Sequence, residues 1–299
     1  MVGAFAKVAT VDEVPPGGSK VVVVAGHPVA LFNVDGAFYA TSNVCLHRGG
    51  PVGEGFVDGV LVAGFERLRR DLGSAYPAVF VILGNDDPHA VEGLVLEADR
   101  RGIWRYVHGW SAPLEGFTVY GYNCVPPTPF LLKDWERYDV SRYVDPGCVA
   151  PEDGSHAPDV SAHELRHATM YQDLARLTAG GDLGRAVCLF HSPPYRTALD
   201  RAALDDRRVD HVALDVHVGS IAIRRLFEAR RPWLGLHGHV HESARLTGLW
   251  QDRIGPTVLL GAAHDGPELA LVRFDLERPA AAARNLVPSN SFISTSDSL

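Results

Sequence analysis

The spacing of hydrophobic residues changes at about residue 64 of the 299-residue chain. Before that point, short β-branched runs separated by glycine-containing turns predict strands at 20–25, 28–33 and 37–40. After it, Phe65, Leu68 and Leu72 recur with helical spacing, and Gly73 is placed to end that helix. The change in period predicts a small β-rich segment, residues 1–63, followed by a larger domain over residues 65–284.

The larger domain alternates apolar runs with helical patterns, which predicts an α/β fold. The run at 78–83 (AVFVIL) is continuous, as in a strand buried on both faces. Further strands are predicted at 116–121, 186–190, 233–237, 257–262 and 268–275, and helices at 88–101, 161–178 and 219–230. The polar residues 285–299 predict a disordered tail.

Composition narrows the class of protein. Hydrophobic residues make up 46% of the chain and charged residues 21%, as in soluble globular proteins with a sizeable core. No apolar run reaches the roughly 20 residues needed to span a bilayer, and the N-terminus lacks a signal-peptide pattern. A net charge of −8 gives no electrostatic case for a nucleic-acid patch. We therefore expect a cytoplasmic protein with no membrane partner.

Three of the predicted strands lead directly into side chains that can bind a metal ion. One run ends in Gly-Asn85-Asp-Asp, the next in His191, and the third in Gly-His239-Val-His241. Because ligands gather at the carboxyl ends of parallel strands, Asn85 and the three histidines are expected to converge there. A nitrogen- and oxygen-rich set of donors suits a divalent ion such as Mn, Fe or Zn.

In this order and spacing, the GNDD sequence, His191 and the GHVH sequence resemble motifs of the calcineurin-like metallophosphoesterases. The resemblance implies a metallophosphoesterase-like β-sandwich flanked by helices, with a two-metal site that hydrolyses a small-molecule or macromolecular phosphoester. It further implies that Asn85, His191 and His239 hold one metal and His241 the other. Asp86 takes the catalytic position that assists the leaving group.

The first motifs of that family are absent from this chain. The resemblance covers residues 65–280, but the family begins with an Asp-x-His pair and a bridging Asp, and Phe65 stands where the bridging Asp would be. The one Asp-x-His sequence, at Asp215 and His217, comes late in the chain. We therefore expect a fold incomplete at its N-terminus and weak hydrolysis at best.

The β-rich segment carries a different chemistry. Cys45 and His47, followed by a glycine-rich turn, resemble the first ligand loop of a Rieske [2Fe–2S] ferredoxin. That family uses two cysteines and two histidines from two loops, and the second loop would fall about sixteen residues later, at Gly64 and Arg67. The resemblance implies an iron–sulfur cluster and a redox partner, yet two ligands are too few to hold one. The alternatives to a hydrolase are a Rieske-type electron-transfer protein and a catalytically silent fusion.

A zincin-like sequence, His-Glu-x-x-His, occupies residues 163–167. Ser161 and Glu164 also form the S-x-x-E pattern of a helix-capping box, which explains the glutamate without catalysis. We therefore interpret this sequence as the start of an exposed helix rather than as a protease site.

Overall fold

The computed structural model describes residues 7–15, 18–24, 27–34, 36–42, 61–157 and 160–288. The chain divides into two compact units, Met1–Tyr76 and Pro77–Leu299. The join predicted at Gly64/Phe65 lies within α1 (Ala63–Leu72), inside the first unit. None of the described helices is both long and apolar enough to cross a membrane.

The first unit contains a three-stranded antiparallel sheet in the order β1-β2-β3, as the β-branched runs predict. The strands are β1 (Ser19–Val24), β2 (His27–Val34) and β3 (Ala37–Ser42), preceded by the 3₁₀ turn η1 (Val11–Glu13). The buried Asn33 side chain donates to the Val14 carbonyl at 2.7 Å and accepts the Gly36 N–H at 2.9 Å. This one amide ties the β2–β3 turn to the segment before the sheet. After α1, Gly73 adopts a positive φ of 52° and ends the helix at the predicted place.

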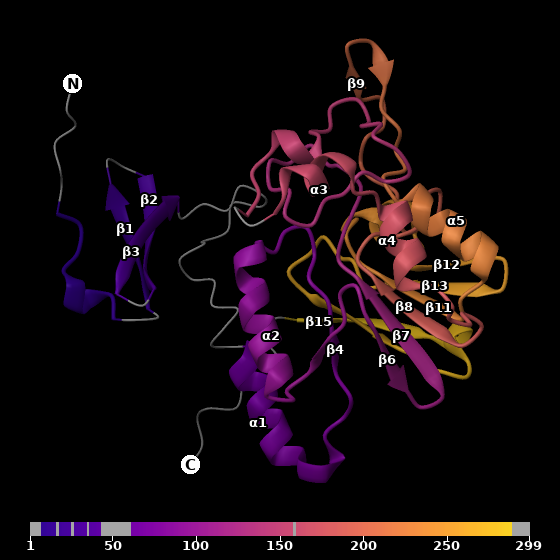
Figure 1. Cartoon of the computed structure of the whole chain (residues 1–299), viewed down its shortest axis with the longest axis horizontal. Coiled ribbons are helices and arrows are strands. Elements are labelled where there is room, and N and C mark those ends of the chain that lie inside the picture. The colour runs from indigo at the N-terminus through magenta and orange to yellow at the C-terminus, as the bar shows by residue number, and fades with distance from the viewer. Residues whose placement is uncertain are drawn as a thin grey trace. The chain divides into compact units, whose positions relative to one another are not determined.

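The second unit is built on a six-stranded sheet in the order β12-β13-β11-β8-β7-β6 (Figure 1). The four central strands run parallel to one another, whereas β12 and β6 pair antiparallel at the two edges. The strands in that spatial order are β12 (Gln251–Ile254), β13 (Thr257–Gly261), β11 (Leu234–His237), β8 (Ala186–Phe190), β7 (Phe117–Tyr122) and β6 (Ser111–Leu114). Four predicted strands correspond to β7, β8, β11 and β13.

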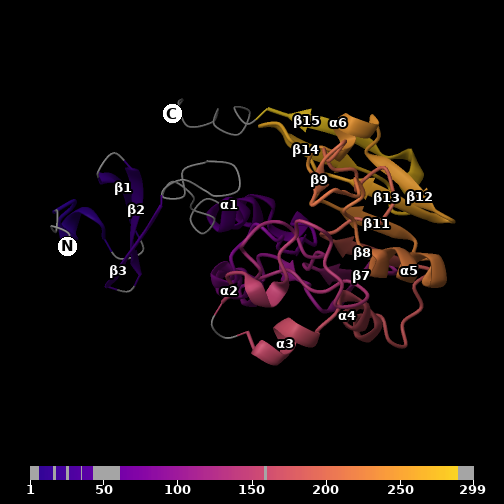
Figure 2. The ribbon, with the colours of Figure 1, turned by 90° about the horizontal axis from the view of Figure 1, so that it is seen from above.

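The sheet is covered on both faces. Figure 2 shows α4 (Met170–Leu177) and α5 (Ile221–Arg230) on one side and the hairpin of β14 (Leu269–Arg273) and β15 (Ala283–Val287) on the other. On the helical side, the rings of Phe190 and Phe227 lie 6.1 Å apart. On the hairpin side, Val272 and its neighbours pack on a buried cluster made of Phe117, Val119, Val187, Leu234, Val258 and Leu260.

Shorter elements connect the layers. A two-stranded parallel sheet pairs β4 (Phe80–Val81) with β5 (Arg105–Tyr106), and α2 (Glu92–Arg100) lies between them in sequence. The remaining elements are η4 (Gly73–Ala75), η5 (His89–Val91), η6 (Pro151–Asp153), α3 (Ala162–His167), β9 (Arg208–Val209), β10 (Val212–Ala213), α6 (Ser243–Thr247) and η7 (Pro279–Ala281).

Three predictions about these elements are wrong. The run at 78–83 forms only the two-residue strand β4, and its residues are half-buried rather than buried on both faces. Among the described residues β4 pairs with a single strand, β5, so it is not a central strand of a sheet. The helix predicted at 161–178 is two helices, since Thr169 adopts extended backbone and caps α4 by accepting the Gln172 N–H at 3.2 Å. The tail predicted from residue 285 begins inside β15, and residues 289–299 lie outside the described part of the chain.

A buried ion pair holds the long connection between β7 and α3. Lys133 and Glu136 are both 0% exposed, and Lys133 Nζ lies 2.6 Å from Glu136 Oε2. Thr128 donates to the same carboxylate through its hydroxyl and its N–H, at 2.5 and 2.8 Å, and its carbonyl accepts from Lys133 at 2.8 Å. Burial raises the pKa of Glu136 to about 7, while the lysine and the threonine donors act against that rise. The connection is therefore ordered by side-chain chemistry rather than by regular structure.

Close packing at Gly121 in β7 gives a test of this architecture. A Cβ there would lie 2.5 Å from the Val107 carbonyl oxygen, so Gly121→Ala should lower the free energy of unfolding by about 1–3 kcal/mol. Gly93 in α2 has open space around it, and Gly93→Ala should raise that free energy by about 0.5–1 kcal/mol. Urea denaturation of both variants measures the two effects. Equal stabilities would contradict the close approach at Gly121.

Candidate functional site

The ends of β4, β8 and β11 bring three of the predicted donors together. Asn85 Oδ1 lies 3.0 Å from His191 Nε2 and 2.9 Å from His239 Nδ1. The two imidazole rings are 5.3 Å apart, centre to centre. Asn85 follows β4 by four residues, whereas His191 directly follows β8 and His239 follows β11 by two. Three segments that are distant in sequence thus contribute one atom each to a single small cluster.

Glycines allow this close approach. A Cβ on Gly84 would lie 2.6 Å from the His191 ring, and one on Gly238 would lie 3.3 Å from it. His239 itself has a φ of 69°, a left-handed conformation that non-glycine residues adopt rarely and at a cost of about 1–3 kcal/mol. Strain of this kind persists where the surrounding structure demands a particular side-chain direction. Here it directs Nδ1 of His239 at Asn85.

The Asn85 amide is oriented by the residues around it. Its Nδ2 donates to Asp86 Oδ1 at 3.3 Å, which assigns Oδ1 as the oxygen that faces the two histidines. The backbone before it is fixed by Leu83, whose N–H donates to Asn123 Oδ1 at 3.0 Å, and by Gly84, whose N–H donates to Asp87 at 2.7 Å. Burial raises the pKa of the Asp87 carboxyl group.

Burial also sets the charge of the histidines at this edge. The pKa of His191 is lowered to about 4, first by burial and then by electrostatic repulsion from the neighbouring His241 and His237. The pKa of His237 is likewise lowered to about 4 by burial, against the opposing effect of two carbonyl acceptors. Both imidazoles are therefore neutral at pH 7, the form in which a ring nitrogen keeps a lone pair for a metal.

The donor geometry is compatible with a bound cation. Two neighbouring ligands at about 2.1 Å from an octahedral ion lie about 3.0 Å apart, and the two distances measured from Asn85 Oδ1 have this value. The set consists of two imidazoles and one amide. Among the described residues, no group of three histidine, cysteine, aspartate or glutamate side chains is arranged to hold a metal ion. His241 is half-buried beside this set, and Asp86 is exposed. Metal binding at these residues stays a prediction.

The other sequence motifs lie outside this cluster. Ser161 Oγ accepts the Glu164 N–H at 3.0 Å, which confirms the predicted helix cap, and Glu164 pairs with Arg137 at 2.7 Å. Asp215 accepts hydrogen bonds from the Tyr195 hydroxyl at 2.5 Å and from the His217 N–H at 2.9 Å. The Asp-x-His sequence therefore makes local contacts instead of joining Asn85. Sequence reasoning missed Asn123 and Asp200, which no motif distinguishes.

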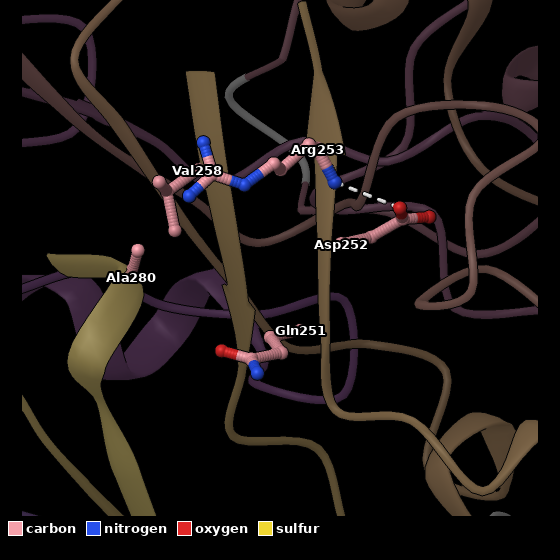
Figure 3. A pocket seen from close by; sticks show the side chains of 5 residues that line it. All are labelled: Gln251, Asp252, Arg253, Val258 and Ala280. Atoms are coloured by element: carbon pink, nitrogen blue, oxygen red, sulfur yellow. Dashed lines mark hydrogen bonds between the residues drawn. The ribbon is translucent and has the colours of Figure 1, made fainter. Parts of the chain in front are cut away.

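Neither of two surface pockets of the second unit is lined by the donors. One, of about 290 Å³, lies on the outer strands and is lined by Gln251, Asp252, Arg253, Val258 and Ala280 (Figure 3). Asp252 in that pocket accepts the Arg253 N–H at 2.7 Å, so part of its lining is already hydrogen-bonded. The other, of about 450 Å³, has His108, Tyr122 and Arg137 among its lining residues.

Cys45 and His47, the predicted Rieske ligands, lie outside the described residues. The positions where the second ligand loop would fall belong to α1, where Gly64 is exposed and Arg67 lies 3.8 Å from Asp71. The sequence of the first unit contains one cysteine and two histidines, Cys45, His27 and His47. A Rieske cluster takes two of each, so the donors of this unit do not complete a cluster.

The comparisons with known proteins concern the first segment. Residues 4–63 match the Rieske [2Fe-2S] domain. The chain is 46% identical to the biphenyl dioxygenase ferredoxin subunit of Pseudomonas sp. (strain KKS102) over 59 residues, which is 19% of this chain and 54% of that protein. It is 39% identical over 51 residues to a Ralstonia ferredoxin component of naphthalene 1,2-dioxygenase/salicylate 5-hydroxylase systems, covering 17% of this chain and 49% of that protein. The chain thus spans about half the length of these relatives.

One solved structure has a weak resemblance to the larger part of the chain. It is the crystal structure of TT1561 of Thermus thermophilus, which shares 15% identity and aligns over 75% of this chain and 79% of that one with a TM-score of 0.40. A similarity at this level establishes neither fold nor function. A Rieske relationship is therefore shown for residues 4–63, and the metallophosphoesterase resemblance stays a prediction.

The neutral, buried His237 predicts how stability depends on pH. The unfolded chain binds a proton on this imidazole below its ordinary pKa of 6.5, whereas the folded chain binds it only below about 4. Stability should therefore fall as pH drops through this window, by about 2 kcal/mol between pH 8 and pH 5 for this group alone. In His237→Gln that share of the pH dependence should vanish. Denaturation at the two pH values measures it, and an unchanged pH slope in the variant would contradict the assignment.

Proposed function

We propose that the second unit is a metal-dependent hydrolase of phosphoesters. The observation that carries this proposal is the convergence of His191 Nε2 and His239 Nδ1 on Asn85 Oδ1. These are the residues that the metallophosphoesterase resemblance selects. Asn85 is 106 residues from His191 and 154 residues from His239 in the sequence. The substrate would be a small-molecule or macromolecular phosphoester.

The residues of the chain have distinct parts in this proposal. Asn85, His191 and His239 would hold one divalent ion, of Mn, Fe or Zn, and His241 belongs to the second metal position. Bound there, a divalent ion supplies Lewis-acid polarisation of a phosphoryl oxygen and a lowered pKa of water. The chain contributes neutral donors, a strained backbone at His239 that aims its ring, and an Asn85 amide fixed by Asp86.

The same residues explain why hydrolysis should be weak. The three converging donors include no carboxylate, so they attract a cation less strongly than the carboxylate-bridged sites that the resemblance implies. His241 is the one predicted ligand of a second ion, and a single ion does not clamp both the attacking and the leaving oxygen. The expected turnover lies well below the ordinary enzyme range of about 1–1000 per second.

A Rieske-type electron-transfer role is the second candidate. It is supported by the match of residues 4–63 to the Rieske [2Fe-2S] domain and by the ferredoxin relatives, which suggest a [2Fe–2S] cluster and a redox partner. The relatives are ferredoxin components of dioxygenase systems. In this chain the role would require a second cysteine from outside the first unit, because Cys45 is the one cysteine in the sequence of that unit.

Metal binding tests the first candidate directly. Equilibrium dialysis against Mn²⁺ or Zn²⁺, followed by metal analysis, should show about one ion per chain in the wild type and a loss of at least tenfold in affinity in His239→Ala and Asn85→Leu. With Mn²⁺ added, turnover of bis(4-nitrophenyl) phosphate should be slow in the wild type and absent in His239→Ala.

The matched control is His163→Ala, an exposed histidine of the zincin-like sequence. This variant should bind the metal ion and hydrolyse bis(4-nitrophenyl) phosphate as the wild type does. Metal binding that survives in His239→Ala, or that disappears in His163→Ala, would contradict the assignment of the site.

Spectroscopy tests the second candidate. We expect the purified chain to show no Rieske-type electron paramagnetic resonance signal after reduction, since Cys45 and His47 give two ligands where four are needed. A signal that is present in the wild type and lost in Cys45→Ala would show that the missing ligands are supplied, and would place electron transfer ahead of hydrolysis.

A further inference from the structure

A second polar cluster is built on the loop that leaves β8. The Asp200 side chain is 0% exposed, and its Oδ1 lies 2.8 Å from His217 Nδ1. Backbone N–H groups also donate to this carboxylate, from Arg196 at 2.8 Å, Thr197 at 2.9 Å and Gly219 at 3.2 Å. Four donors therefore fix the two oxygens of Asp200, and the carboxylate is rigid.

This contact determines the orientation of His217. Because Nδ1 faces a carboxylate, the proton of the neutral ring resides on Nδ1 and the lone pair on Nε2. The His217 side chain is 29% exposed, and within the described part of the chain its Nε2 makes no hydrogen bond. A buried carboxylate that holds one ring nitrogen and leaves the other accessible is the arrangement that proton-transferring histidines use.

The accessible side of His217 is polar and carries charges of both signs. The Tyr195 ring stands edge-on to His217 at 6.2 Å, and its hydroxyl donates to Asp215 at 2.5 Å. The exposed Arg196 places its guanidinium 5.2 Å from the centre of the Tyr195 ring. Arg196 has a φ of 55°, a conformation stabilised by its N–H bond to Asp200.

The cluster adjoins the candidate donors through the segment 191–195. On one side, Ser220 donates its N–H to the Pro193 carbonyl at 2.9 Å and accepts the Tyr195 N–H at 3.0 Å. On the other side, the Ser192 carbonyl lies 3.0 Å from His237 Nδ1, two residues before His239. The loop that carries His217, just before α5, and the end of β11 that leads to His239 thus flank the same five residues, whose first member is the donor His191.

We propose that His217, positioned by Asp200, donates the proton to the leaving oxygen during phosphoester hydrolysis. This inference rests on the proposed function of the second unit. Water adds to phosphorus and releases a proton to solvent, the bond between phosphorus and the leaving oxygen breaks, and that oxygen takes the proton from Nε2 of the doubly protonated His217. The neutral ring then recovers a proton from solvent, so the sum is water plus ester giving acid plus alcohol.

The chemistry of the leaving group follows from this role. An imidazole gives and takes protons near neutral pH, which a carboxyl group does less readily. Such a donor matters for alkyl and simple aryl esters, whose oxygens leave poorly without a proton. The substrate class of the site is therefore phosphoesters of unactivated alcohols.

A pair of substrates that differ only in leaving group tests the proposal. The full chain with Mn²⁺ is assayed on methyl 4-nitrophenyl phosphate, whose leaving group needs no proton, and on methyl phenyl phosphate, whose leaving group does. In His217→Gln, kcat/KM for the phenyl ester should fall by about 10²–10⁴-fold, while that for the nitrophenyl ester should fall less than about threefold. The control His211→Gln, on the exposed β9–β10 hairpin, should change neither value.

Each outcome has a defined meaning. Equal falls for both esters, or no fall for either, overturn the role of His217 while leaving the proposed hydrolysis intact. A wild type that hydrolyses neither ester overturns both proposals. Histidine ¹⁵N NMR of the wild type gives a readout that is independent of turnover. The His217 resonances are identified by their absence from the spectrum of His217→Gln, and their chemical shifts should show that the neutral ring is protonated at Nδ1. A neutral ring protonated at Nε2 overturns the assignment.

Discussion

The parallel alignment of β7, β8, β11 and β13 is the constraint on which the rest of the second unit depends. The carboxyl ends of parallel strands lie at the same edge of a sheet. His191 and His239, which follow the neighbouring strands β8 and β11, therefore lie side by side. The ladder requires close contacts between backbone and side chain, such as those at Gly121 and Gly235, where a Cβ would meet a neighbour at 2.5 Å. The donors are neighbours because the strands below them are held in register.

This explains how much could be predicted from the sequence. Central strands are buried on both faces, so β7, β8, β11 and β13 appear as continuous apolar runs. His191 directly follows β8, and His239 follows β11 by two residues. Edge strands such as β6 and β12 mix polar and apolar residues, and the hydrophobic pattern did not predict them. The convergence of Asn85 with two histidines was therefore foreseeable from order and spacing.

Other features depend on contacts that no local pattern encodes. The helix break at Thr169 arises from a capping bond in the middle of an otherwise helical stretch. The role of Asp200 depends on three backbone donors and His217, which the chain brings together only after folding. β4 is short because its apolar run has one neighbouring strand among the described residues. Its length therefore depends on strand pairing, which the composition of the run does not reveal.

The shortness of β4 affects how firmly Asn85 is held. Its backbone is attached through the ladder to one neighbouring strand, β5, which is extended by bonds from the Arg105 N–H to Val79 and from the Val107 N–H to Val81, and through the Asn123 side chain. His191 and His239, by contrast, extend from strands paired on both sides. Segments with few hydrogen bonds open locally at a lower free energy than the core. Amide hydrogens near Asn85 would then exchange with solvent faster than those of β8 and β11, and a ligand bound to all three donors would slow that exchange most at Asn85.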